Sequence, residues 1–342
     1  MYLPVLKNRT VEFNVLKQLY QIPISKNVIP LIEIIQEKIQ SNSSIPLVEE
    51  VHNTLNRTTH PFMIDLIKTN IPNNIMPAIR DFLTKVNRNR EFYLDVLKSF
   101  NIIENAIPVI SYNNSGFNVE DIIDDTRILR DIFPILAFRL FSGSFSSVFP
   151  EIRKLLNKSD YLILDIGSAS HINPAIKKLY MEVNKNKRDI GFQSIIINSN
   201  KAKEITNKGL ENGEPIFDID NSLRDSYKNY SFDGFGDFAC VSNELPSSGG
   251  TISPAGIYYS FDYNFFIGFR RNRELSEFEE FIAPSIVASE YWNEFSEEHH
   301  RKCPGCRTIL NIIEKTEMGK SQAKWKGITM SHYIYTMSER LQ

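Results

Sequence analysis

Short apolar segments alternate with segments of helical periodicity through the first two thirds of the chain. The apolar segments are rich in Ile, Val, Leu and aromatic residues, which is typical of β-strands. They comprise residues 2–6, 28–35, 62–67, 107–111, 135–140, 161–166 and 193–197. Several are apolar nearly throughout, as expected of parallel strands buried on both faces of a sheet, so a parallel sheet is predicted.

Between the predicted strands, apolar residues recur at spacings of three and four, the pattern of amphipathic helices. These segments are residues 10–19, 45–55, 73–86, 119–132, 149–156 and 175–183. Because parallel strands need crossover connections, the alternation predicts a closed (β/α)8 barrel of the TIM type or an open doubly wound α/β sheet. The barrel is favoured, since no GxGxxG follows the first strand and no GxxxxGKS/T occurs in the chain.

The regular alternation fades after residue 198. Two β-like segments follow, residues 235–242 and 256–269, and the pattern leaves open which of them closes the barrel and which pairs at an edge. The remainder is predominantly helical. The predicted organisation is a barrel domain of residues 1–272, irregular in its last units, and a helical C-terminal elaboration of residues 273–342.

Composition sets limits on partners and compartment. Of the 342 residues, 42% are apolar and 23% are charged, which suits a folded core. A formal charge of -2 provides no global attraction to nucleic acid or lipid, so any such contact must be local. The N-terminus lacks a signal-peptide pattern, and no stretch reaches the about 18 apolar residues of a membrane span. Three cysteines form no disulfide framework, so a cytoplasmic protein without a membrane partner is expected.

Charged residues lie near the carboxyl ends of several predicted strands, where barrel proteins form their sites. They are Lys7, Glu33, Asp65, Arg139 and Asp165, each flanked by apolar neighbours. One interpretation is a structural ion-pair network. The other is a mixed-charge pocket, in which the carboxylates bind Mg²⁺ or Mn²⁺ or act as general acid and base, while Lys7 and Arg139 hold an anionic group.

Two further segments could add to such a site. Asp237, in DGFGDFACVS, is a fourth candidate catalytic carboxylate near a predicted strand, although a Gly-Asp pair is equally typical of a turn. Arg270 and Arg271 follow an aromatic-rich segment, residues 258–269. If those aromatic side chains are exposed they could stack on bases, with the arginines contacting phosphates; otherwise they pack into the core.

The sequence CPGC contains Cys303 and Cys306, with His299 and His300 shortly before it. Thiolates and imidazoles at these spacings are candidate ligands of a structural zinc ion. The chain has no second CxxC, so Cys240 or His332 would have to be brought in by the fold. A redox dithiol and an ordinary Pro-Gly turn are the alternatives.

Several segments, in their order along the chain, resemble the phage beta protein family of T-even phages and bacterial defence-associated loci. They are MYLPVLKNRTVEFNVLKQL, VIPLIEI, LILDIG, FGDFACVS, IYYSFDYNFFIGFRR and AKWKGITMSHYI. The resemblance implies a barrel-like fold and a role in phage defence or phage–host conflict, and it carries no reaction. It gives weight to the charged and polar residues inside these segments: Lys7, Arg9, Glu12, Glu33, Asp165, Asp237 and His332.

Two functions follow as hypotheses. In the first, the barrel mouth binds or cleaves a phosphate-containing ligand, a nucleotide or nucleic acid, with Lys7, Arg9, Glu12 and Arg139 among the ligand-binding residues. In the second, the protein is a non-catalytic sensor or binding module that recognises a phage component or a defence-system partner protein. The sequence leaves open whether the protein is an enzyme; an enzyme would be a phosphodiesterase or nuclease-like hydrolase.

Overall fold

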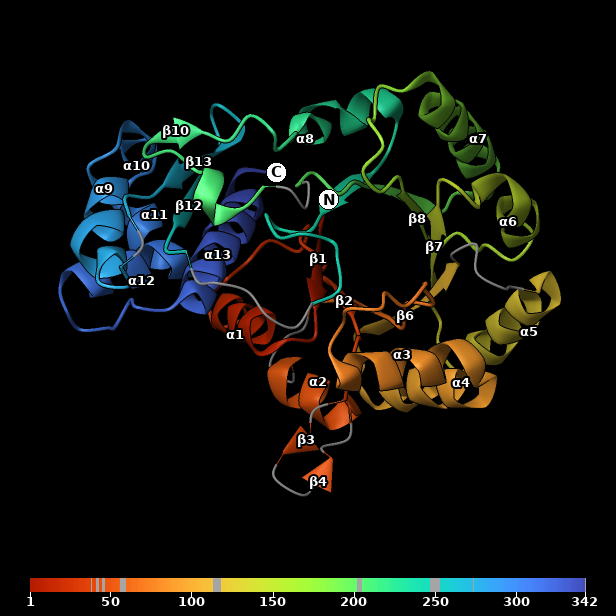
Figure 1. Ribbon diagram of the computed structural model, residues 1–342. Coiled ribbons are helices and arrows are strands. Elements are labelled where there is room, and N and C mark those ends of the chain that lie inside the picture. Colours follow the sequence, from red (N-terminus) through yellow and green to blue (C-terminus); the bar gives the residue numbers. More distant parts are fainter. Residues whose placement is uncertain are drawn as a thin grey trace.

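Eight parallel strands close into a barrel, with helices around it (Figure 1). The computed structural model describes the chain except for residues 38, 41–42, 45–46, 56–59, 113–117, 202–204, 247–252, 273 and 342. In order around the barrel, the strands are β1 (Tyr2–Lys7), β2 (Leu31–Glu33), β5 (Phe62–Asp65), β6 (Ala106–Tyr112), β7 (Ala137–Phe141), β8 (Tyr161–Asp165), β9 (Gln193–Ile197) and β11 (Gly234–Asp237). The predicted (β/α)8 barrel is confirmed, and the open-sheet alternative is wrong because β11 pairs with β1 and completes the ring.

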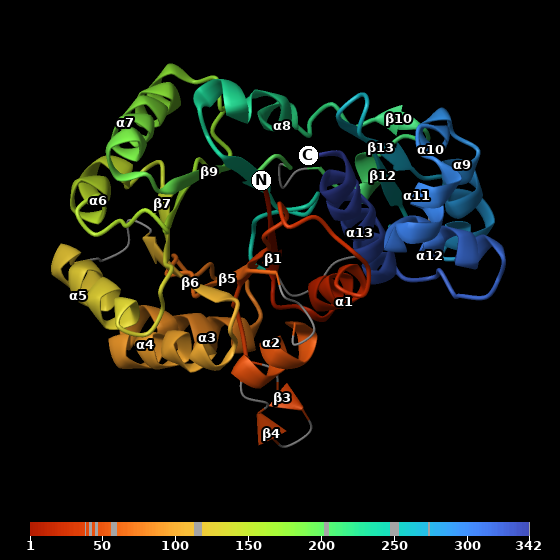
Figure 2. The ribbon, with the colours of Figure 1, turned by 180° about the vertical axis from the view of Figure 1, so that it is seen from behind.

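Helices follow most of the barrel strands and form the outer layer seen in both ribbon views (Figures 1 and 2). They are α1 (Thr10–Leu19), α2 (Leu47–Leu55), α3 (Pro77–Arg88), α4 (Arg90–Ser99), α5 (Val119–Arg130), α6 (Phe145–Ile152), α7 (Pro174–Ile190) and α8 (Ser222–Ser226). Three 3-10 turns add Phe100–Ile102, Asn207–Gly209 and Tyr227–Tyr230, and a small hairpin pairs β3 (Ile39–Gln40) with β4 (Ser43–Ser44).

Helix α6 begins earlier than its predicted range, residues 149–156. Phe145 and Phe149 lie one helical turn apart, both are buried, and their rings stack with centroids 4.5 Å apart. This apolar pair extends the helix toward its N-terminus and leaves Pro150 inside it. Helix α4 was not predicted from the sequence. Asn89 caps its N-terminus by accepting a hydrogen bond from the Phe92 N–H at 2.9 Å. Residues 45 and 46 of the predicted helix 45–55 lie outside the described part of the chain.

The first of the two β-like segments closes the barrel. Strand β11 lies between β1 and β9, and a Cβ atom at Gly236 would come within 2.5 Å of the Leu3 carbonyl oxygen. Glycine at this position therefore permits the closing strand to approach its neighbour. The second segment forms the hairpin β12 (Gly256–Ser260) and β13 (Phe265–Phe269), which joins β10 (Glu214–Pro215) in a separate antiparallel sheet.

The C-terminal helices gather on one side of the barrel together with β10, β12 and β13 (Figures 1 and 2). They begin with a π-helical turn (Phe278–Ile282) and continue as α9 (Ala283–Val287), α10 (Glu290–Asn293), α11 (Glu297–Lys302), α12 (Pro304–Ile313) and α13 (Gln322–Arg340). Helix α13 packs against both α1 and β12. The domain boundary at residues 272 and 273 stays a prediction, and Arg273 lies outside the described residues. No described helix has the length and apolarity needed to cross a membrane.

The barrel has two apolar layers, one inside the strands and one between strands and helices. Along β1, for example, Leu3 and Val5 belong to the inner cluster, whereas Tyr2 and Leu6 belong to the outer one. This alternation is the period of two that a strand imposes on its side chains. It decides which side chains can reach the interior of the barrel mouth.

Candidate functional site

Charged side chains form the next interior layer above the apolar one, at the carboxyl ends of the strands. Each lies two residues after a member of the inner apolar cluster, as Glu33 follows Leu31 and Asp65 follows Met63. Among the described residues, the layer contains the charged Lys7, Glu33, Asp65, Arg139 and Asp165 and the polar Ser111. The structure thus brings together the five charged residues predicted for the barrel mouth. Sequence reasoning missed Ser111, although it has the same strand phase as Val109.

Arg139 lies at the centre of this layer and binds three carboxylates. Its Nη1 lies 2.9 Å from Glu33 Oε1 and 2.8 Å from Asp65 Oδ2. Its Nη2 and Nε lie 2.6 and 2.9 Å from Asp165 Oδ2. All four side chains are buried, with at most 3% of any residue exposed. The guanidinium group therefore satisfies carboxylates from three other strands in an environment where an unpaired charge would be costly.

Lys7 joins the network through Glu33, which also binds Arg139. Its Nζ lies 3.3 Å from Glu33 Oε2 and 5.1 Å from the centre of the Phe238 ring. Burial lowers the pKa of Lys7. Burial alone would raise the pKa of Glu33, but the positive charges of Lys7 and Arg139 outweigh it, so the pKa of Glu33 is lowered.

Asp65 differs from Glu33 in the direction of its pKa shift. Burial raises its pKa from 3.8 to about 6, against the lowering effects of Arg139 and of the hydroxyl of Ser111, which donates to Asp65 Oδ1. With two cations and three carboxylates, the network has a formal charge of -1 when Asp65 is ionised and zero when it is protonated. Internal pairing thus leaves the layer close to neutral.

Basic side chains from three parts of the chain lie near one another, and the first of them, Arg9, adds positive charge near Lys7. Arg9 follows β1 and pairs with Glu12 on α1 through Nε and Oε1, 2.6 Å apart. Lys326 lies on α13, and its pKa is lowered by partial desolvation of the ammonium group and by the positive charges of Arg9 and Lys201 nearby, although the residue as a whole is exposed. With Glu12, these three basic residues carry a formal net charge of +2. We call Arg9, Lys201 and Lys326 the basic cluster.

Two members of the basic cluster were not predicted from the sequence. Lys201 follows β9 in a segment without clear periodicity, and Lys326 belongs to the AKWKG segment near the other end of the chain. Of the predicted ligand residues, Arg9 belongs to the basic cluster and Glu12 pairs with it. The signal for Lys326 was its place inside a segment shared with the resembled family, but Lys326 is so far from Arg9 along the chain that the sequence did not show that they lie near each other.

Asp237 does not join the interior network. Its neighbour in register is Pro4, which has the outward phase of Tyr2 on β1. Asp237 accepts hydrogen bonds from the hydroxyls of Tyr2 at 2.9 Å and Tyr333 at 2.6 Å, and from the Ala239 N–H at 2.8 Å. Burial raises its pKa against these three hydrogen bonds. The expectation that Asp237 would gather with the other three carboxylates is therefore wrong, and its contacts instead join β11, β1 and α13.

The arginines after β13 contact groups other than the network. Arg270 donates to the Lys208 carbonyl oxygen at 2.6 Å, and the Arg271 guanidinium lies over the Phe281 ring at 5.2 Å. Most aromatic side chains of the preceding segment are buried, as Tyr258 and Phe266 illustrate. This segment mainly packs into the core, which was the alternative to base stacking.

Three of the four predicted metal ligands lie together, and His332 takes the place predicted for His300. His299, Cys303, Cys306 and His332 are all buried, and their possible ligand atoms lie within 4.8 Å of one another, so this cluster could hold a metal ion. His300 is excluded because its ring stacks on Trp292 at 3.9 Å and its Nε2 lies 3.1 Å from the Trp292 carbonyl oxygen. The pKa of Cys303 is lowered because the neighbouring thiol and imidazole groups outweigh burial.

Comparisons with known proteins place the chain in a family. A GH18 chitinase from Pseudoalteromonas aurantia matches with a TM-score of 0.42 and 10% identity over 69% of this chain and 92% of that one. The putative copper homeostasis protein CutC from Streptococcus agalactiae matches with a TM-score of 0.38 and 8% identity over 70% of this chain and 98% of that one. No curated protein matches. The family model described as Beta protein matches residues 2–339, so the chain belongs to the Beta protein family, the phage-associated family that its sequence resembles.

Proposed function

We propose that this protein binds a phosphate-containing ligand, a nucleotide or nucleic acid, at the mouth of its barrel. The observation that carries the proposal is the basic cluster, in which Arg9, after β1, and Lys201, after β9, add positive charge near Lys326 on α13. A bound phosphate would relieve the repulsion at Lys326 and offer further acceptors to these donors. The position also agrees with the rule that barrel sites form after the carboxyl ends of strands.

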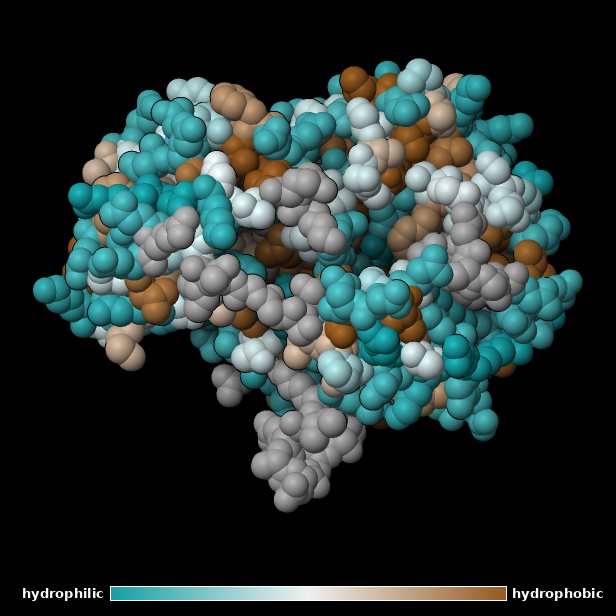
Figure 3. All heavy atoms as spheres, viewed as in Figure 1, coloured by the Kyte–Doolittle hydropathy of each residue, from teal (hydrophilic) through white to brown (hydrophobic). Residues whose placement is uncertain are grey.

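The buried network forms the floor of this proposed site. Its carboxylates already bind Arg139, so they do not add a large unpaired negative charge beneath the ligand. Its rigidity would hold the ends of β1, β2, β5, β7 and β8 in fixed positions. The face seen in Figure 3 is hollowed near its centre, inside the ring of helices.

The ion pairs of the buried network favour ligand binding without cleavage. Glu33, Asp65 and Asp165 are all paired with Arg139. At least one of these ion pairs would have to break before a carboxylate could bind Mg²⁺ or Mn²⁺ or transfer a proton to or from a substrate. A role as a sensor in phage–host conflict agrees with the family and with a charge network that is internally paired. Hydrolysis is kept as an outcome of the test.

The first experiment is a thermal-shift series on the full chain with AMP, ATP, pyrophosphate and a 5′-phosphorylated oligonucleotide, with adenosine as the uncharged control. Ligand binding to the folded state raises Tm, so we expect at least one phosphate compound to raise it while adenosine does not. No shift with any phosphate compound would contradict the proposal.

The second experiment separates binding from hydrolysis. The ligand found by thermal shift is incubated with the protein and Mg²⁺ or Mn²⁺, and products are followed by chromatography. We expect intact ligand. Product formation that is lost in Asp165→Asn, in a variant whose Tm matches the wild type, would identify a hydrolase instead.

A further inference from the structure

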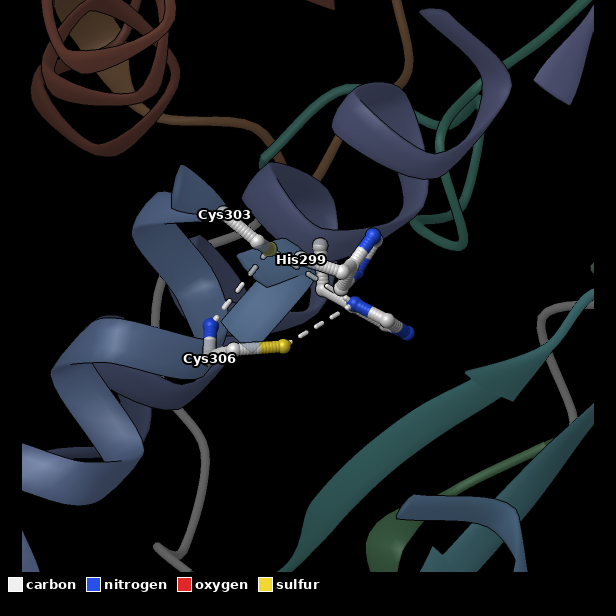
Figure 4. A group of neighbouring side chains, drawn as sticks. His299, Cys303 and Cys306 are labelled. Atoms are coloured by element: carbon white, nitrogen blue, oxygen red, sulfur yellow. Dashed lines mark hydrogen bonds between the residues drawn. The ribbon is translucent and has the colours of Figure 1, made fainter. Parts of the chain in front are cut away.

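Four potential metal ligands meet where the C-terminal helices contact the antiparallel sheet. His299 lies on α11, Cys303 caps the N-terminus of α12, Cys306 lies in the first turn of α12, and His332 lies on α13. None of the four is more than 2% exposed. Figure 4 shows the side chains of His299, Cys303 and Cys306 pointing toward one another. The cluster is therefore enclosed and is separate from the charged layer of the barrel.

The spacing of the ligand atoms suits tetrahedral coordination. Zinc bonds of about 2.3 Å to sulfur and about 2.0 Å to nitrogen place a sulfur and a nitrogen ligand about 3.5 Å apart in a tetrahedral site. His332 Nδ1 lies 3.7 Å from Cys303 Sγ and 3.4 Å from Cys306 Sγ. These distances match two ligands that share one ion.

The outer nitrogen of each histidine has a partner that leaves the inner nitrogen available as a ligand. His332 Nε2 lies 2.9 Å from the Tyr259 carbonyl oxygen and must donate to it, so Nδ1 presents its lone pair to the thiols. His299 Nδ1 lies 2.7 Å from Glu339 Oε2. Its Nε2 is buried and has no hydrogen-bond partner among the described residues. Such outer contacts to carboxylates and carbonyls are typical of metal-binding histidines.

Gly305, within CPGC, explains how His332 reaches the two cysteines. A Cβ atom at this position would lie 2.5 Å from the Ile328 carbonyl oxygen and 2.8 Å from the His332 backbone nitrogen. Glycine thus allows the first turn of α12 to touch the backbone of α13. Pro304 at the start of α12 costs no hydrogen bond, because the first N–H groups of a helix have no internal partner.

We infer that His299, Cys303, Cys306 and His332 form a structural zinc site that fixes α13 in place. Two thiolates and two imidazoles in a tetrahedral arrangement select zinc, and a site with four protein ligands leaves no position for substrate. The redox alternative requires a thiolate that other molecules can reach, whereas both sulfur-bearing residues are fully buried.

The zinc site also supports the barrel mouth through α13. Tyr333 follows His332 directly and donates its hydroxyl to Asp237 at the end of the closing strand. Lys326 of the basic cluster lies on the same helix. This consequence rests on the proposed function, whereas the zinc site itself does not.

The test uses the full chain, purified without chelators and without added metal. Elemental analysis should find about one zinc per chain. Replacing the zinc with Co²⁺ should give the visible absorption of a tetrahedral, thiolate-bound cobalt ion, a result that needs no variant. Protein that contains no stoichiometric metal, and that neither binds Co²⁺ in this form nor gains thermal stability from added zinc, would overturn the inference.

Variants then assign the ligands. Cys306→Ser and His332→Ala should reduce bound zinc at least tenfold, whereas Cys240→Ser, which removes a buried cysteine outside the cluster, should leave the zinc content unchanged. If Cys306→Ser fails to fold, the cobalt spectrum of the wild type still decides the question. Equal zinc content in all three variants would overturn the ligand assignment.

Loss of zinc and loss of ligand binding are separable. Zinc present in a protein that binds no phosphate compound would refute the proposed function alone. Phosphate binding in a protein that has no metal, and gains none, would refute the zinc site alone.

Discussion

Arg139 determines the chemistry of the barrel interior because three carboxylates from three other strands depend on it. The distances from its guanidinium to Glu33, Asp65 and Asp165 are those of charge-assisted hydrogen bonds. A buried group of this kind contributes modestly as a whole, because desolvation offsets attraction. Removing one partner lowers stability strongly, because it leaves the remaining charges buried and unpaired.

Arg139→Met should therefore reduce the free energy of unfolding by about 3–5 kcal/mol, because it leaves carboxylates unpaired in the interior. Urea denaturation at neutral pH measures the loss. Arg153→Met is the matched control, since Arg153 is exposed and its replacement should change stability little. A loss below about 1 kcal/mol for Arg139→Met would contradict a buried ion-pair network.

Asp65 should give stability a defined pH dependence. Its pKa is about 6 in the folded protein, raised from 3.8 by burial. From about pH 4 to pH 6, the folded chain keeps a proton that the unfolded chain has released, so the Asp65 contribution lowers stability as pH rises through this window. Above it the effect is constant.

Asp65→Asn removes this titration. Between about pH 4 and pH 7, the wild type should lose on the order of 3 kcal/mol more stability than the variant. Chemical denaturation at the two pH values provides the comparison. Parallel pH profiles for the two proteins would show that Asp65 titrates normally.

At the scale of the element, the position of a charge along its strand accounts for most of what the sequence could predict, and strand phase accounts for what it could not. Lys7, Glu33, Asp65, Arg139 and Asp165 were predicted at the barrel mouth because they lie near the carboxyl ends of predicted strands, and the structure brings them together. The phase of Asp237 could not be predicted, because Gly234 and Gly236 leave β11 without an apolar alternation. His332 was named only as a residue that the fold would have to supply, since helical periodicity does not tell which helices touch.

The close contact between α12 and α13 depends on the absence of a Cβ atom at Gly305. Gly305→Ala places a Cβ atom against two backbone groups that cannot rotate away, so it should lower Tm and reduce bound zinc together. Elemental analysis and a thermal melt measure both. Gly209→Ala is the control, because a Cβ atom there has no neighbour within 4 Å. Wild-type zinc content and Tm in Gly305→Ala would contradict the close contact.

At the scale of the whole molecule, the barrel and the C-terminal helices act as one assembly. Helix α13 packs on α1 and β12, carries a zinc ligand, reaches Asp237 through Tyr333, and contributes Lys326 to the barrel mouth. The family match spans residues 2–339, so it includes these helices as well as the barrel. The basic cluster exists only because both parts are present, which is why sequence analysis of the barrel strands alone could not find it.

Removing single charges from the basic cluster tests most directly whether phosphate binds at the barrel mouth. The phosphate compound with the largest thermal shift is titrated into the wild type, Lys201→Ala, Lys326→Ala and Lys178→Ala by isothermal titration calorimetry. Lys178 is exposed on α7 and serves as the control for loss of one positive charge. We expect Lys201→Ala and Lys326→Ala each to weaken binding about tenfold, corresponding to about 1.4 kcal/mol, and Lys178→Ala to bind like the wild type. Unchanged affinity in both cluster variants, or equal weakening in all three, would contradict phosphate binding at the barrel mouth.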